Sequence, residues 1–325
     1  MYANCFLYII YFEYRVSTEF VQSSGAIARD DSKFERMSEM NLQNEVVEKA
    51  RAKINLSIDI TGKRDDGYHE IRMIMQTVEL HDTVTVRQCS EGISISCKSP
   101  FVPIDQRNVA WKAAKLFFDQ YQIKAGVSIR IEKTIPVAAG LAGGSANAAA
   151  VLRAMRKLFK PEVTDEELRE LSKKIGADVS YCVSGGTVLA EGIGDNLTSL
   201  PKLKGVTILL VKPGIGVSTP QVYKKFQMEN VTAHPDIDQM IKDIVAKDVR
   251  AIAKGMVNVL ETVTIQDHPV IQKIKDGMME LGCLGCVMSG SGPSVVGIFD
   301  DDETAEKAFA YYARQPYDVF LTKTI

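Results

Sequence analysis

Apolar and polar residues alternate over long stretches of the first half of the chain, with the period of two that is typical of β-strands. The clearest case is the series Ile54, Leu56, Ile58 and Ile60, in which every second residue is aliphatic. This alternation predicts a strand near residues 47–59 that is buried on one face and polar on the other. Further strands are predicted near residues 70–80, 83–89, 93–97, 127–132 and 186–191.

Helical periodicity follows these first strands instead of alternating with them. Apolar residues recur at helical spacing near residues 108–121, 145–159 and 164–175, and the last segment begins with the capping box Thr164-x-x-Glu167. Strands that arrive in a cluster, with most helices after them, are typical of an α+β fold.

A short break at residues 201–205 precedes a hydrophobic run and predicts a domain boundary. Beyond it we expect strands near residues 206–212, 286–288, 294–299 and 319–322, and helices near residues 236–259, 269–281 and 303–313. Helices on one face of a small sheet would account for this order. The predicted domains are residues 45–203 and residues 204–325, after an N-terminal extension at residues 1–44.

The N-terminal extension has an unusual composition. Its apolar stretch at residues 5–12 is too short to cross a membrane, and it lacks the basic start and the small-residue cleavage site of a signal peptide. The acidic pair Asp30 and Asp31 argues against a transit peptide. Because Met37 and Met40 stand shortly before the first strand, we expect this extension to be non-native or disordered.

Composition and charge exclude several classes of protein. With 325 residues, of which 46% are hydrophobic and 25% charged, the chain is typical of a soluble globular protein. A net charge of −2 does not favour nucleic-acid binding. The 6 cysteines are scattered, and the pair Cys283 and Cys286 has no second pair to complete a zinc site. A reducing, cytoplasmic setting follows.

Small residues dominate positions 136–150, which read PVAAGLAGGSANAAA. The predicted strand at residues 127–132 precedes them, and an Ala-rich helix follows with Ser145 as its expected N-cap. Glycines let a backbone approach a ligand closely, and the N–H groups of a helix start converge with the positive end of the helix dipole. The segment is therefore predicted to bind phosphate.

This loop does not match the two common phosphate-binding motifs. No Gly-Lys-Ser/Thr follows the glycines, as a Walker A motif requires, and the glycine spacing differs from that of the dinucleotide-binding fingerprint. The alternative interpretation is a tight loop whose glycines only allow close helix packing.

Three other segments contribute candidate polar residues. The candidates are Lys53 and Asn55 on the polar face of the first strand, Tyr68 and His69 after the turn GKRDDG, Asp178 after a predicted helix, and the Gly/Ser-rich run 288–299. Each has an ordinary structural alternative. A lysine is usually solvated, an aspartate in a turn usually bonds local backbone, and a tyrosine commonly packs beneath a hairpin.

Taken together, these motifs resemble those of the GHMP kinase superfamily. The matching segments are AKINL at 52–56, GKR at 62–64, DGYH at 66–69, the loop at 136–150, GADV at 176–179, EGIGD at 191–195 and SGSGPS at 289–294. The likeness extends from about Lys49 to the C-terminus. It implies an α+β fold of two domains, ribosomal-S5-like and then ferredoxin-like, with the active site between them.

The resemblance implies phosphoryl transfer from ATP with Mg²⁺ as the metal. In the family pattern Asp178 is the general base that takes the proton of the acceptor hydroxyl, and Lys53 lies beside it. A lysine cation keeps a neighbouring aspartate ionised by lowering its pKa, and it can offset charge on the γ-phosphoryl group. The metal ligands are not identified by the sequence.

The resemblance also assigns the ATP contacts. The loop residues implied are Pro136, Val137, Ala138, Ala139, Gly140, Leu141, Ala142, Gly143, Gly144, Ser145 and Ala146. The Ser145 hydroxyl is an extra donor or an indirect Mg²⁺ contact. Asn108 and Lys133 are assigned to adenosine by position alone. Ser291 and Gly292 are expected either to support the loop or to form a simple hairpin turn.

Segment 62–69 is similar to the branch of the superfamily that phosphorylates cytidyl-diphosphate-methylerythritol in the non-mevalonate isoprenoid route. The implied substrate contacts are Asn55 to the methylerythritol, Tyr68 and Tyr223 stacked on cytosine, His69 on its polar edge and Thr219 near the diphosphate. The implied reaction is phosphorylation of the 2-hydroxyl group.

The loop departs from the family pattern at several positions. Ala138, Ala139 and Ala142 stand where glycine is usual, and Ala146 stands where a second serine is common. Because alanine does not adopt positive φ without cost, we predict negative φ at the first three positions.

Two alternatives remain open. One is another small-molecule GHMP kinase, for a mevalonate-type, homoserine or sugar substrate, against which only segment 62–69 and Tyr223 argue. The other is a non-catalytic nucleotide-binding regulator, against which Lys53 and Asp178 argue. In each case the predicted protein is cytoplasmic, binds a small molecule and not nucleic acid or a membrane, and is a monomer or a homodimer.

Overall fold

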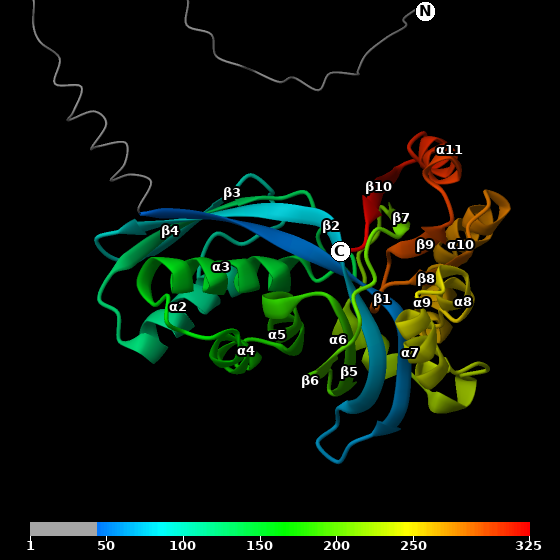
Figure 1. Cartoon of the computed structure of the whole chain (residues 1–325), viewed down its shortest axis with the longest axis horizontal. Helices are drawn as coiled ribbons and strands as arrows, with labels where there is room; N and C mark the ends of the chain where they lie inside the picture. Colours follow the sequence, from blue (N-terminus) through cyan, green and yellow to red (C-terminus); the bar gives the residue numbers. More distant parts are fainter. Residues whose placement is uncertain (1–43) are drawn as a thin grey trace, which may run out of the picture. The chain divides into compact units, whose positions relative to one another are not determined.

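The computed structural model describes residues 44–325, which form two β-sheets covered by helices (Figure 1). The mixed helix and sheet content confirms the predicted α+β class. Apart from Asn44, the predicted extension lies outside the described residues. The division between residues 203 and 204 stays a prediction, and every strand of the second sheet follows it.

The first sheet has six strands and is built around the long strand β2 (His69–Cys89). Its strands are β1 (Glu45–Lys63), β2, β3 (Ile93–Cys97), β4 (Gly126–Glu132), β5 (Thr187–Gly192) and β6 (Asn196–Ser199). β2 pairs antiparallel with β1, β4 and β5. Two separate strands were predicted where β2 is continuous. The prediction was wrong because His81 and Asp82 keep their pairing with β1 across the expected break.

Four helices lie on the side of the first sheet, the last but one of them packed mainly on the other three rather than on the strands (Figure 1). They are α2 (Val109–Tyr121), α3 (Gly143–Phe159), α4 (Asp165–Lys173) and α5 (Ala177–Ser184). The small residues of α3 at positions 146–150 are almost fully buried, which lets this helix pack closely on β1 and β2. The capping box of α4 is present as predicted, with Thr164 and Glu167 bonding each other's backbone N–H groups. The short helix α5 was not predicted.

The second sheet has four strands in the order β10-β7-β9-β8. Its strands are β7 (Thr207–Pro213), β8 (Gly285–Met288), β9 (Val295–Phe299) and β10 (Tyr317–Lys323). Its helices are α6 (Thr219–Lys225), α7 (Ile237–Ala246), α8 (Val249–Lys254), α9 (Glu261–Asp267), α10 (Val270–Glu280) and α11 (Asp302–Tyr312), with a 3₁₀ turn at Met228–Asn230.

One predicted helix of this half is divided in the structure. The segment 236–259 forms α7 and α8, because Lys247 adopts a left-handed conformation with φ 57° and Asp248 then caps the next helix. Helices α6 and α9 and strand β6 were not predicted.

Strand β1 was expected to be buried on one face only, but its residues 52–58 are buried on both faces. Its apolar side chains join the core of the second sheet, with Ile54 and Leu56 packed among Ile208 and Val287. The backbone of β1 also contacts the predicted phosphate loop, because Lys53 N donates to Leu141 O at 3.2 Å. The face predicted to be polar and solvated is therefore an interior surface of the molecule.

No helix in the described part of the chain is both long and apolar enough to span a membrane. The cysteines at positions 89, 97, 182, 283 and 286 are free thiols.

Candidate active site

Helix α3 begins two residues earlier than the sequence predicted. Its N-cap is Ala142, which has φ 54° and no side chain that can accept a hydrogen bond, and Ser145 is the third residue of the helix. The first hydrogen bond within the helix runs from Ala146 N to Ala142 O at 2.8 Å. The amides of residues 143–145 come before it and therefore have no carbonyl acceptor within the helix. These amides belong to residues that line a large cavity, as a phosphate site requires.

The prediction of negative φ at the alanines of the loop was wrong at two positions. Ala138 has φ 52° and Ala142 has φ 54°, whereas Ala139 is not left-handed. A left-handed alanine costs about 1–2 kcal/mol, so the surrounding structure has to hold it in place. Ala139 and Leu141 supply that hold, because both are buried in the core between the two sheets.

Gly140 is required by close contact as well as by conformation. Its φ is +75°, and a Cβ built on it would lie 2.2 Å from Ser289 O. Ser289 also donates its hydroxyl to Gly140 O at 3.0 Å. Support for the loop was expected from Ser291 and Gly292, but it comes mainly from Ser289. Ser291 Oγ instead lies 2.7 Å from Thr219 Oγ1.

One cavity of about 1180 Å³ gathers the predicted site residues. It is lined by Lys53, Asn55, Tyr68, His69, Asn108, Lys133, Pro136, Val137, Ala138, Ala139, Gly140, Leu141, Ala142, Gly143, Gly144, Ser145, Asp178, Thr219 and Tyr223. Ala146 is the exception, because it points into the core of the first sheet at 1% exposure. Residues of the first sheet and its helices thus meet residues of α6 around one space.

Lys53 is a buried cation with one side-chain partner. It is 5% exposed, and its ammonium donates to Asn55 Oδ1 at 2.7 Å. Asn55 is held in turn, because its backbone N–H donates to Ser289 Oγ at 3.2 Å. Register shifts in β1 flank both residues, and such bulges redirect side chains. The solvated-lysine alternative does not apply.

Asp178 lies in the first turn of the unpredicted helix α5. The expected direct pairing with Lys53 is not made, since no ion pair joins the two in residues 44–325 and the Lys53 ammonium contacts Asn55 instead. The two charges still act on the same thiol. Burial, and then the Asp178 charge, raise the pKa of Cys182 to about 12, while Lys53 opposes this rise. Both groups therefore lie near Cys182, and both line the cavity.

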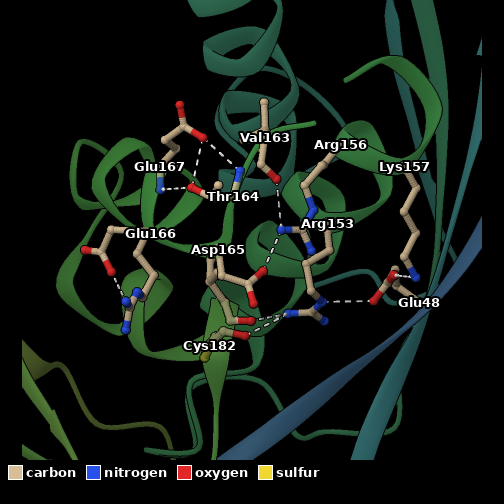
Figure 2. Close-up of polar contacts among 12 residues, drawn as sticks. Glu48, Arg153, Arg156, Lys157, Val163, Thr164, Asp165, Glu166, Glu167 and Cys182 are labelled. Atoms are coloured by element: carbon tan, nitrogen blue, oxygen red, sulfur yellow. Dashed lines mark hydrogen bonds and ion pairs between the residues drawn. The ribbon is translucent and has the colours of Figure 1, made fainter. Parts of the chain in front are cut away.

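Arg153 of α3 bonds to both β1 and α5, the two elements that carry Lys53 and Asp178 (Figure 2). From α3 its guanidinium donates to Glu48 Oε2 at 2.9 Å, to Cys182 O at 2.8 Å and to Lys49 O at 3.1 Å. The first and last partners belong to β1, and Cys182 O lies near the C-terminal end of α5, where a cation is favourable. Nothing in the sequence indicates this role, because an arginine within a helix is usually solvated.

Asn108 and Lys133 line the cavity, but local contacts occupy both side chains. Asn108 caps α2 by accepting from Ala110 N at 2.9 Å and donates to Pro103 O at 2.6 Å. The Lys133 ammonium is paired with the Asp82 carboxylate at 2.5 Å. Their assignment to adenosine therefore stays a prediction.

The substrate-side candidates surround an aromatic cluster at the β1–β2 hairpin. Tyr68 is 62% exposed, while the His69 ring lies 5.5 Å from the Tyr223 ring and 5.9 Å from the Phe226 ring, measured between centroids. Burial, and then the nearby Lys63 charge, lower the pKa of His69. Burial, and then the Asp178 charge, raise the pKa of Tyr223 to about 12. Both rings are therefore neutral near pH 7.

Family models match both halves of the described chain. Residues 108–186 match the family described as GHMP kinases N terminal domain, and residues 240–318 match GHMP kinases C terminal. The chain is 50% identical over 277 residues to 4-diphosphocytidyl-2-C-methyl-D-erythritol kinase of Acetivibrio thermocellus, covering 85% of this chain and 98% of that protein. It is 49% identical over 277 residues to the enzyme of the same name from Clostridium novyi, covering 85% and 99%.

Solved structures show the same fold. The crystal structure of a 4-(cytidine 5′-diphospho)-2C-methyl-D-erythritol kinase has a TM-score of 0.75 and 29% identity, covering 86% of this chain and 99% of that one. Homoserine kinase from Cytophaga hutchinsonii has a TM-score of 0.71 at 20% identity, covering 87% and 98%. The second likeness concerns the fold alone. The two-domain kinase fold expected from the sequence is confirmed.

Proposed function

Since this chain belongs to the GHMP kinase family, we propose that it transfers the γ-phosphoryl group of ATP to the 2-hydroxyl of 4-diphosphocytidyl-2-C-methyl-D-erythritol. Relatives at 46–50% identity over nearly their whole length carry the name of that kinase. The observation that carries the proposal is the single cavity in which a helix-start phosphate loop, a lysine, an aspartate and an aromatic hairpin meet.

The loop would hold the triphosphate of ATP. The amides of residues 143–145 open α3 and line the cavity, so they and the helix dipole favour anionic oxygens there. Phosphoryl transfer needs mainly positioning and charge stabilisation, and a rigid backbone site supplies both. The contacts of Gly140 with Ser289 keep this site in place before ATP arrives.

Asp178 and Lys53 would act on the acceptor hydroxyl. We assign the Asp178 carboxylate as general base, because it is half-buried at the cavity wall and carries no ion-pair partner in the described residues. The Lys53 ammonium lies on Asn55 Oδ1 and retains two further N–H donors for the hydroxyl oxygen and the γ-phosphoryl group. The acceptor hydroxyl would thus contact both Asp178 and Lys53, which do not contact each other in the free protein.

Magnesium fits this site as a metal held mostly by phosphates and water. Residues 44–325 contain no group of three or more His, Cys, Asp or Glu arranged to bind a metal ion. Mg²⁺ needs only one or two protein oxygens, and the Ser145 hydroxyl and Asp178 carboxylate both line the cavity. When bound, the metal neutralises charge on the transferred group.

The hairpin would recognise the cytidine end of the acceptor. An aromatic ring stacks on any base, and exposed Tyr68 and half-buried Tyr223 both line the cavity. A neutral His69 has one ring nitrogen that accepts and one that donates, which suits the polar edge of cytosine. Asn55 and Thr219 would contact the methylerythritol and the diphosphate.

Turnover with a panel of acceptors tests the proposal. With ATP and Mg²⁺, we expect kcat/KM for the cytidyl substrate to exceed that for mevalonate or homoserine by about a hundredfold or more. Equal activity on mevalonate would support another GHMP kinase, and ATP binding without transfer to any acceptor would support a regulator.

A further inference from the structure

Asp82 is a buried carboxylate that the proposed chemistry does not use. It lies in β2, its side chain is 0% exposed, and four donors surround it. Oδ1 accepts from Thr134 N and Ile135 N, each at 2.8 Å. Oδ2 accepts from Lys133 Nζ at 2.5 Å and Asn147 Nδ2 at 2.8 Å. These four hydrogen bonds replace the water contacts that the buried carboxylate has lost.

The donors come from both ends of the phosphate loop. Residues 133–135 connect β4 to the loop, and Asn147 lies in α3 just after it. The loop between them contains the left-handed Ala138 and Ala142, whose conformation has to be imposed from outside. Lys133 also packs close to Gly143, since a Cβ on that glycine would lie 3.0 Å from Nζ.

We propose that Asp82 is a positioning residue that clamps the two ends of the phosphate loop and so sets the loop for the triphosphate. The inference rests on the proposed function only in taking the loop as the nucleotide site. It assigns Lys133 a part in this clamp, in addition to lining the cavity. Asp82 itself is not among the residues that line the cavity, so its effect passes through the loop.

A swap of two side chains tests the clamp. In Asp82→Asn, the carboxylate charge is lost and the new amide places N–H donors against the Lys133 ammonium, which has no acceptor, so the loop should open. In Asp82→Asn with Asn147→Asp, the amide again has a carboxylate to donate to, and Lys133 retains an anion. The probe is the non-hydrolysable analogue AMP-PNP with Mg²⁺, titrated by calorimetry, together with KM for ATP and for the cytidyl acceptor.

We expect Asp82→Asn to weaken AMP-PNP binding by about tenfold or more, with KM for the acceptor within about twofold. The double variant should recover most of that loss. Binding within twofold of the original protein in Asp82→Asn, an equal rise in both KM values, or no recovery in the double variant would overturn the proposal.

A milder change keeps the test decisive if Asp82→Asn does not fold. Asn147→Ala removes one of the four donors and suits a helix, so the protein should fold and KM for ATP should rise about threefold. An unchanged KM for ATP would then overturn the clamp. AMP-PNP binding needs no acceptor, so inactivity of the original protein on the cytidyl substrate would count against the proposed function and not against the clamp.

Discussion

The two ends of the cavity are built in different ways. On the phosphate side, backbone amides form the site, and buried contacts hold the loop from β1, from the Ser289 turn and from Asp82. On the hairpin side, side chains form the proposed site. Tyr68 is 62% exposed beside the surface ion pair of Arg64 and Asp66, while His69 and Tyr223 are half-buried. Exposed ion pairs of this kind contribute little stability.

The difference leads us to expect that the two ligands bind at different entropic cost. The phosphate side is preorganised, so ATP binding loses little conformational entropy there. The hairpin side must order the exposed Tyr68 when the acceptor binds, and stacking and hydrogen bonds to the base would offset that cost. Changes on the first side should affect folding and ATP together, and changes on the second should affect the acceptor alone.

The largest expected effect lies where the two sides meet. Asp178→Asn should lower kcat by about 10²–10⁴, the usual contribution of a general base, with little change in either KM. Steady-state kinetics with both substrates measure this. The control is Asp165→Asn, which changes an aspartate in the first turn of the neighbouring helix α4 and should leave kcat unchanged. Near-normal turnover in Asp178→Asn would remove that residue from its role.

A matched pair of glycine substitutions tests the difference between the phosphate side and the hairpin side of the cavity. Gly140→Ala forces a Cβ against Ser289 O at 2.2 Å and places alanine at φ +75°. We expect a loss of about 2–5 kcal/mol in the free energy of unfolding and a rise in KM for ATP of about tenfold or more. Denaturant unfolding and kinetics measure these effects.

The matched control is Gly67→Ala on the hairpin. Its φ is +86°, but no atom of residues 44–325 lies within 4 Å of the added Cβ, so only the backbone cost of about 1–2 kcal/mol remains. KM for ATP should not change. Equal destabilisation by the two substitutions would show that the loop is not held by close contact with Ser289.

Removal of the exposed ring tests the hairpin side. Tyr68→Ala should raise KM for the cytidyl substrate about tenfold by loss of one stacking contact, with KM for ATP unchanged. Tyr68→Phe keeps the ring and should retain the original KM. Equal effects of Tyr68→Ala on both substrates would contradict the assignment.

The smallest expected effect is a pH dependence on the same side. Because burial lowers the pKa of His69 below its usual 6.5, the neutral ring is favoured in the folded protein. Its contribution to stability is fully present above pH 6.5 and is lost as the pH falls through the lowered value. KM for the acceptor should therefore stay level from pH 8 to pH 6.5 and rise about twofold or more below that range.

His69→Asn should remove this rise and leave the pH dependence of KM for ATP as it was. A rise in acceptor KM that begins above pH 6.5 in the original protein would show that another group is responsible.

Most predicted strands and helices lie within a few residues of the observed ones, because their periodicity is strong. The failures have local causes. The segment of α5 contains Gly176 and only eight helical residues, too few for a periodic signal. The predicted Ser145 cap was displaced to Ala142, whose left-handed φ depends on the burial of Leu141 and on the Ser289 contact at Gly140.

The candidate site likewise contains residues that the sequence predicted and residues that it did not. Nearly all predicted residues line one cavity. The loop and Asp178 lie at helix starts, whereas Lys53 and Asn55 lie within β1 between two register shifts. Asp82, Arg153 and the role of Ser289 were missed. Each is a single polar residue in an ordinary context, and its partners lie 51 or more positions away for Asp82 and up to 234 for Ser289.

The amino-acid sequence by itself determined the α+β class, the glycine loop before a helix, and the polar residue types that a kinase of this family needs. These follow from local periodicity and short motifs. Only the tertiary structure decided that Lys53 is buried, that two alanines adopt left-handed φ, and that a carboxylate from β2 clamps both ends of the loop. Burial and long-range hydrogen bonds depend on which segments pack together, and that is fixed only when both sheets close around the cavity.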